Sequence, residues 1–267
     1  MGAAEASAGA REHDPRPRWT DVVVEFGLTT VLVFCAVTGV RWLVVADSPL
    51  VVADAAAAAA ANGLFIGIVL VVLIKSPPGR RSGAHMNPAI SVALWLMGVF
   101  PGRWVAAYAC AQLAGSVGGT ALGRLVWGPV LSRASVRYAA VRPGAAWNTW
   151  GVAATECACL VVVVVLVGCF LARPSLSRLL PYAVGAVTAV IIAVLSQHSG
   201  ASVNPSRQLG PAVFAGEVGL LWVYLLAPVV GAVAGAGVHR LLRCCLRFPG
   251  PCTFRLCGDD GAGVPGR

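Results

Sequence analysis

Two asparagine–proline pairs carry most of the chemistry that this sequence offers. Asn87-Pro88 and Asn204-Pro205 each follow a Ser-Gly-Ala sequence, and each opens a short apolar stretch. Proline is favoured in the first turn of a helix, and asparagine just before it is a preferred N-cap. Both pairs therefore predict helix starts. The full motifs read Ser82-Gly83-Ala84-His85-Met86-Asn87-Pro88-Ala89 and Ser199-Gly200-Ala201-Ser202-Val203-Asn204-Pro205-Ser206.

The duplication of the pair points to function, because a single Asn-Pro pair caps many ordinary helices. The apolar stretches that follow are about eleven residues long, too short to cross a bilayer, and lie among longer ones that can. Broken hydrophobic segments at equivalent places in two halves indicate a site at the membrane midplane. Two helix starts there would oppose cations with their dipoles and offer amide hydrogen bonds to neutral hydroxylic molecules.

Composition predicts an all-helical protein of the membrane. Of the 267 residues, 58% are hydrophobic and 12% are charged, and the mean hydropathy is +0.79. Soluble domains are about one quarter charged. Because the first of six candidate spans is too long for a signal peptide and has no clear cleavage site, we interpret it as retained. The candidate spans cover residues 22–45, 53–74, 104–126, 150–171, 179–196 and 220–238.

The order of these segments repeats along the chain. Each half runs span, span, short Asn-Pro segment, span, and three spans per half is an odd number. The second half is therefore expected upside down, with its short segment entering from the opposite side. We expect a channel domain over residues 19–247, with halves at about 19–127 and 148–247. Residues 1–18 and 248–267 are expected to be disordered tails.

Membrane topology accounts for the net charge of +9 better than nucleic-acid binding does. If both termini are cytoplasmic, most bases near the spans lie inside, as the positive-inside rule requires. The loop 127–148 departs from the rule, because Arg133, Arg137 and Arg142 would lie outside. We expect a multi-pass protein of the plasma membrane that contacts lipid and no nucleic acid. The inside bases are Arg11, Arg16, Arg18, Lys75, Arg80, Arg81, Arg173, Arg178, Arg240, Arg243, Arg247 and Arg255.

Four polar residues near the motifs have alternative roles. A charge as deep as Arg207 marks a functional site, and we favour pore lining over a structural cation tied to carbonyls. Glu25 and Glu156 occupy equivalent places in the first span of each half. They are either proton carriers or, as we favour, acceptors for free backbone N–H groups of the motif loops. His85 is expected to hold its loop, with a pH gate as the alternative.

At these residues the chain resembles the major intrinsic protein family, the aquaporins and aquaglyceroporins. The resemblance covers about residues 20–243 and departs at Ser206, where the family usually has alanine. It implies a right-handed bundle of six transmembrane helices with two re-entrant half-helices, assembled as a homotetramer with one pore per subunit. Outside the motifs it rests on Glu25, Glu156, Trp222, Tyr224 and Pro228. The implied pore motifs are Asn87, Pro88, Ala89, Asn204, Pro205 and Ser206.

In that family, four side chains form the narrowest point of the pore. Counting from the motifs places Arg207, Ala201 and Ile192 there, with the fourth near Gly67 and Ile66 as its rival. Water-selective members usually carry histidine where this chain has Ile192. The set is similar to that of the nodulin-like branch, which passes uncharged metalloid acids.

The resemblance implies a passive channel for water and small uncharged solutes of the glycerol, urea, boric or arsenous acid type, with ions and protons excluded. Gln208 and Ala212 stand where glycerol facilitators usually carry Asp and a base, which weakens a glycerol-specialist assignment. No cysteine spacing has the paired histidines of a strong metal site, so we expect neither a metal nor a cofactor.

Two other classes of function remain as alternatives. A secondary transporter also uses inverted repeats and broken helices, and it would need Glu25 and Glu156 as ion-coupling carboxylates. Sensitivity of uptake to proton or sodium gradients would reveal it. An intramembrane enzyme would use His198 with Ser199 or Ser202. Because no third orienting group is evident, we expect no enzyme.

Overall fold

The computed structural model describes residues 18–245, which form helices and loops with no β-strand among them. Five helices are long and apolar enough to cross a membrane. The sixth expected span, α8 (Leu180–Leu195), has 16 residues and so measures about 24 Å. It is the only expected span that falls short by length. The five longer helices are α1 (Trp19–Val44), α2 (Ala55–Lys75), α5 (Val105–Trp127), α6 (Thr149–Leu171) and α10 (Leu221–Cys245).

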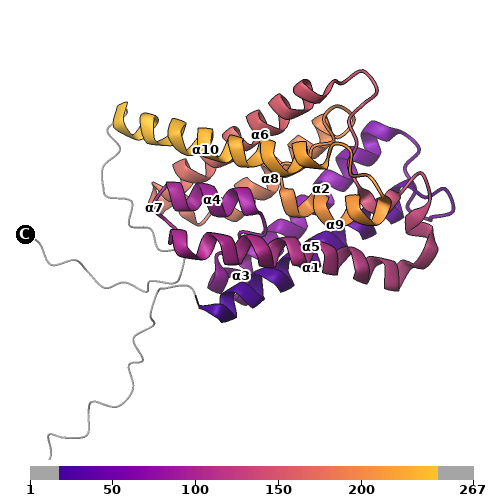
Figure 1. The fold of residues 1–267 in the computed structure, drawn as a ribbon, viewed down its shortest axis with the longest axis horizontal. Helices are drawn as coiled ribbons and strands as arrows, with labels where there is room; N and C mark the ends of the chain where they lie inside the picture. The colour runs from indigo at the N-terminus through magenta and orange to yellow at the C-terminus, as the bar shows by residue number, and fades with distance from the viewer. Residues whose placement is uncertain (1–17, 246–267) are drawn as a thin grey trace, which may run out of the picture.

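The two Asn-Pro pairs begin short helices, as the sequence predicted. α4 (Pro88–Leu96) and α9 (Pro205–Ala215) lie in opposite ends of the bundle, α4 on the left and α9 on the right of Figure 1. Asn87 Oδ1 accepts from the backbone N of Ala89 at 3.0 Å, and Asn204 Oδ1 accepts from that of Ser206 at 2.9 Å. Each asparagine is thus the N-cap of a half-helix whose proline occupies the first turn.

Helix packing follows the expected inverted repeat. α1 packs on α5 as α6 packs on α10, and these are equivalent pairs in the two halves. The half-helix of each half packs against the last span of the other half, α4 on α10 and α9 on α5. α2 and α8, which are equivalent to each other, pack together where the halves meet. The bundle is therefore interlocked rather than two separate units side by side.

Short helical segments connect the spans. α3 (Pro77–Ser82) leads from α2 into the first motif, and α7 (Pro174–Ser177) joins α6 to α8. Three 3-10 turns lie around α5 and in the loop after it: η1 (Gly102–Trp104), η2 (Gly128–Ser132) and η3 (Arg137–Ala139). The predicted tails 1–18 and 248–267 lie outside the described residues except for Arg18.

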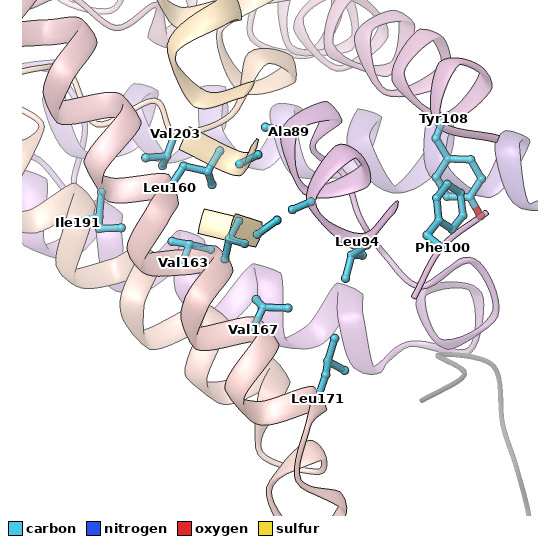
Figure 2. Close-up of a cluster of buried hydrophobic side chains, with 14 of the residues drawn as sticks. Ala89, Leu94, Phe100, Tyr108, Leu160, Val163, Val167, Leu171, Ile191 and Val203 are labelled. Atoms are coloured by element: carbon cyan, nitrogen blue, oxygen red, sulfur yellow. The ribbon is translucent and has the colours of Figure 1, made fainter. Parts of the chain in front are cut away.

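The largest buried apolar cluster joins α6 to the first half-helix. Figure 2 shows Leu160, Val163 and Val167 along one side of α6, beside Ala89 and Leu94 of α4. These α6 residues recur every three or four positions, which places them on one helix face. The main helix contacts of α4 are with α10 and α5, and the bond from Asn87 to Val203 places its Asn87 end beside the second motif.

Candidate channel site

A cavity of about 830 Å³ runs along the inside of the bundle. Its wall includes α2 residues from Ala55 to Ile74, which are about 28 Å apart at 1.5 Å per residue. Asn87, Asn204 and Arg207 also lie on the wall. The cavity therefore extends along nearly the full length of a transmembrane helix and passes both asparagines.

The two motif loops are joined at this cavity by reciprocal hydrogen bonds. Asn87 Nδ2 donates to the carbonyl of Val203 at 3.0 Å, and Asn204 Nδ2 donates to that of Met86 at 2.9 Å. A carboxamide NH₂ group has two hydrogens, so each asparagine keeps a second donor. The arrangement brings two amide donors and two half-helix N-termini to the same stretch of the wall.

The backbone of both loops takes the same unusual course. Gly83 and Ala84 have φ of 90° and 48°, and the equivalent Gly200 and Ala201 have 96° and 52°. Met86 and Val203 repeat the pattern at 48° and 44°. Left-handed backbone at non-glycine residues is unfavourable and must be held by its surroundings.

Buried carboxylates hold these loops. Glu25 accepts from the Ser82 hydroxyl at 2.7 Å and from the backbone N of His85 and Met86 at 3.0 and 2.7 Å. Gln112 Nε2 also donates to it at 2.8 Å.

Glu156 repeats the pattern in the second half. It accepts from the Ser199 hydroxyl at 2.9 Å and from the backbone N of Ser202 and Val203 at 3.1 and 2.6 Å. Like Glu25, it is fully buried. Both geometries fit the acceptor role favoured from the sequence, because both oxygens of each carboxylate are engaged.

Sequence reasoning missed a third repeated contact. Tyr108 donates its hydroxyl proton to the Ser82 carbonyl at 3.0 Å, and Tyr224 donates to that of Ser199 at 2.6 Å. Both tyrosines are buried in the last span of their half. Aligning the two halves of the sequence on the Asn-Pro pairs would have placed them within one position of each other, since Tyr108 is 21 residues after Asn87 and Tyr224 is 20 after Asn204.

His85 is tied into the first loop. Its Nδ1 lies 2.9 Å from the Ser91 hydroxyl, and its ring packs edge-on against Phe100 at 4.6 Å between centroids. The imidazole also lies on the cavity wall. These contacts fit the loop-holding role expected for it.

Arg207 meets both descriptions offered for it from the sequence. Its side chain lies on the cavity wall together with Ala201 and Ile192. Its Nη1 donates to the carbonyl of Ala139 at 2.6 Å. The guanidinium is thus a wall residue whose direction is set by a backbone carbonyl of the loop after α5.

The expectation for Gly67 is corrected by the structure. A Cβ at this position would come within 2.6 Å of the Gly185 carbonyl oxygen, so Gly67 faces α8 and is absent from the cavity wall. The rival Ile66 does lie on the wall. Asn62, one turn further from the motif, is also on the wall, and its neighbour Gly63 lies level with Ile192.

Counting back from Asn87 failed because the connection has its own helix. The six residues of α3 take up chain between α2 and the motif, so a fixed offset selects a residue too close to α3. Residues 62 and 66 share one helix face, whereas 63 and 67 share the neighbouring face towards α8. Asn62 is therefore the α2 side chain at the level of Ile192.

Gly67→Val is expected to destabilise the protein rather than reshape the channel. The added atoms would meet the backbone of α8, and such overpacking costs about 1–3 kcal/mol of unfolding free energy. The thermal unfolding midpoint in detergent measures it. Gly27→Val is the matched control, because a Cβ there meets nothing within 4 Å. An unchanged midpoint with selective loss of glycerol flux would put Gly67 back in the constriction.

The arginines that break the positive-inside pattern are held by acidic partners. Arg133 pairs with Asp47 at 3.0 Å, and Arg137 pairs with Glu217 at 3.4 Å. Arg142 also pairs with Glu217. These ion pairs give the three bases of the loop a local structural role.

These features define a multi-pass membrane channel built from two inverted halves around the cavity that passes both asparagines. The chain belongs to the major intrinsic protein family, whose model matches residues 13–239. It is a passive channel for water and small solutes.

Individual relatives agree with this assignment. The propanediol uptake facilitator PduF of Citrobacter freundii is 34% identical over 211 residues, 66% of this chain and 76% of its own. Aquaporin NIP1-3 of Oryza sativa subsp. japonica is 36% identical over 177 residues, 66% of this chain and 60% of its own, so less than two thirds of that protein is matched. The X-ray structure of the aquaglyceroporin from Plasmodium falciparum has the same fold, with a TM-score of 0.70 and 22% identity over 85% of this chain and 97% of that one.

Proposed function

We propose that the channel passes small uncharged hydroxylated solutes together with water, and that Asn62, Ile192, Ala201 and Arg207 form its constriction. The observation that carries this proposal is the composition of the wall. Among the described residues, no Phe, Tyr or Trp lines the cavity. Without an aromatic ring to narrow it, a constriction of these four side chains leaves room for more than a single file of water.

Exclusion of ions and protons follows from the charges around the asparagine pair. The N-termini of α4 and α9 bring partial positive charge to the midplane, and Arg207 adds a full charge nearby. A cation would meet like charge without a full hydration shell. A neutral solute can instead accept hydrogen bonds from the second N–H of Asn87 and Asn204.

The relatives favour particular solutes. One is named a propanediol uptake facilitator, and several others are NIP aquaporins, the branch that the constriction resembled from sequence. We propose diols, glycerol, urea and the uncharged boric and arsenous acids as the solute class. The apolar wall of Ile192 and Ala201 suits the carbon skeleton of a diol, and Arg207 suits its hydroxyl oxygens.

A coupled transporter is less well supported. It would need carboxylates that are free to bind and release an ion. Glu25 and Glu156 each accept two backbone N–H groups and a serine hydroxyl, so ion binding would have to displace bonds that hold the motif loops. Nor do we propose a catalytic role for Ser199, whose hydroxyl donates to Glu156.

Stopped-flow measurements on proteoliposomes test the proposed function. We expect water, glycerol, 1,2-propanediol, urea and boric acid to cross faster than in protein-free liposomes, with no dependence on a proton or sodium gradient. Sodium and proton leak should equal that of protein-free liposomes. Uptake driven by either gradient would instead support a transporter, and water flux alone would reject the solute class.

Asn62→Phe combined with Ile192→His is expected to make the channel water-selective. Two rings at the constriction should reduce glycerol and boric acid flux by more than tenfold and water flux only slightly. The narrowed pore would still admit a water molecule but would exclude the larger solutes. Val190→His is a control, because Val190 is exposed on the outside of α8. Equal loss of water and solute flux would place the constriction elsewhere.

We further propose a homotetramer in the plasma membrane with both termini cytoplasmic and residues 19–247 as the channel domain. Large apolar side chains are exposed on the outer faces of the helices, where lipid or neighbouring subunits would cover them, including Leu64, Val72, Val162, Val190 and Val230. The bases Lys75, Arg80, Arg81, Arg173 and Arg178 support the orientation. Native mass measurement and labelling of single introduced cysteines at residues 80 and 133 test these assignments.

A further inference from the structure

The loop after α5 contains a strained turn that contacts the channel arginine. Arg137, Tyr138 and Ala139 are three consecutive non-glycine residues in the left-handed region, with φ of 44°, 53° and 61°. Such residues usually visit this region singly, because Cβ approaches the following carbonyl oxygen. The carbonyl of Ala139, at the end of the turn, accepts the hydrogen bond from Arg207.

A strained turn persists only where its surroundings over-determine it, and such turns cluster at functional sites. Tyr138 supplies one restraint from inside the turn. Its ring is buried against Phe214 of α9, with centroids 5.5 Å apart, and its hydroxyl accepts from Arg124 of α5 at 3.0 Å. The side chain therefore anchors the middle of the turn to two helices.

Residues of α9 and its C-terminal end contact the loop on both sides of the turn. Gln208, next to Arg207 in the first turn of α9, brackets Val141: its Oε1 accepts from the Val141 N at 2.9 Å, and its Nε2 donates to the Val141 carbonyl at 3.1 Å. Glu217, just beyond the other end of α9, pairs with Arg137 and Arg142. Gln208 is buried, which leaves water little access to these bonds.

The position of Glu217 is itself fixed by the end of α9. Gly216 ends the helix in the left-handed conformation, with φ of 69°, and the backbone N of Glu217 donates to the Ala212 carbonyl at 2.8 Å. α9 and the residues at its end thus carry Arg207, the Gln208 side chain that bonds Val141, and the Glu217 carboxylate that pairs with two arginines of the loop. The turn cannot relax without breaking contacts to the same element that presents the arginine.

We propose that Gln208 and Glu217 are positioning residues that set the width of the constriction by holding the turn at residues 137–139 under Arg207. This inference rests on the proposed function. While the turn is held, the Ala139 carbonyl keeps the guanidinium at the wall. When the contacts of Gln208 or Glu217 with this loop are lost, the turn relaxes to right-handed backbone and the Ala139 carbonyl turns away. Arg207 then no longer limits the opening of the constriction.

Gln208→Leu tests the proposal, since it removes both bonds to Val141 at similar size. It also removes the long contact of 3.5 Å from Arg207 Nη1 to Gln208 Oε1, so the rescue variant below is needed to show that the turn carries the effect. We expect the glycerol-to-water permeability ratio in proteoliposomes to rise severalfold, with Glu217→Gln giving a smaller rise. Gln208→Glu keeps the acceptor for the Val141 N and should lie between wild type and Gln208→Leu. The controls are Gln197→Leu, whose side chain is exposed, and Asp47→Asn, which breaks a surface pair outside the turn. Both should keep the wild-type ratio.

A rescue variant separates positioning from simple loss of folded protein. Ala139→Gly keeps the carbonyl and removes the Cβ that disfavours left-handed backbone. Added to Gln208→Leu, it should return the permeability ratio towards wild type. Unchanged ratios in the single variants, parallel loss of both fluxes with a lowered thermal midpoint, or failure of the rescue would each overturn the inference. Wild-type liposomes that pass water but no solute would reject the proposed function instead.

Discussion

Replacing Glu156 with alanine is expected to abolish the folded channel. The substitution leaves the Ser199 hydroxyl and the backbone N–H groups of Ser202 and Val203 without their acceptor. Each buried unsatisfied donor costs roughly 1–3 kcal/mol. Three such donors together would therefore remove much or all of the unfolding free energy of an ordinary domain. Size-exclusion profiles and thermal midpoints of the purified protein in detergent measure the effect.

Two further variants calibrate this expectation. Glu156→Gln keeps one acceptor oxygen and turns an NH₂ group towards a donor, so its thermal midpoint should lie between those of wild type and Glu156→Ala. Asp54→Ala is the matched acidic control, because the Asp54 side chain caps α2 through one bond to Ala57 at 2.7 Å. Loss of such a cap costs about 1 kcal/mol. A well-folded Glu156→Ala protein with altered pH dependence of flux would make Glu156 a proton carrier.

Asn87→Asp is expected to convert the neutral-solute channel into one that leaks cations. Aspartate is as good an N-cap as asparagine, so α4 should still form. The carboxylate cannot donate to the Val203 carbonyl, and it places negative charge where two helix dipoles oppose cations. Sodium entry into proteoliposomes, followed with a fluorescent indicator, should rise well above that of wild type while water flux falls.

Asn62→Asp is the control for that experiment. It makes the same chemical change on the same cavity wall but away from the half-helix N-termini. We expect little sodium entry, because Asn87 and Asn204 remain neutral donors. Sodium entry that was equal in the two variants would show that charge anywhere along the cavity matters, and that the asparagine pair has no special part in ion exclusion.

The sequence predicted the fold well because its main signals are local or repeated. Apolar runs marked the spans, and the Asn-Pro pairs marked the starts of α4 and α9 at the residues where they occur. What it could not predict were contacts between segments far apart in the chain. The bond from Arg207 to Ala139 and the bracket of Gln208 on Val141 join loop and half-helix across more than sixty residues.

Of the four proposed constriction residues, the one on α2 could not be placed from the sequence. Ile192 and Ala201 do lie on the wall. The sequence could place them because Ala201 belongs to the second motif and only a short segment separates Ile192 from it. Gly67 was the wrong α2 residue because the six residues of α3 intervene before the motif. The single step from Ile66 to Gly67 also matters, because it turns a side chain on a helix by about 100° to another face. Gly67 then faces α8, and Asn62 takes the wall.

The reciprocal bonds from Asn87 to Val203 and from Asn204 to Met86 have a consequence for biosynthesis. Each half supplies the hydrogen-bond acceptor for the asparagine side chain of the other half. Lipid chains cannot form hydrogen bonds with these amide and carbonyl groups. A chain halted after its first half would expose an incomplete re-entrant loop inside the bilayer. The pore should therefore close in one late step, after the final helix has inserted, and a truncated product should be recognised as defective by the cell's membrane proteases.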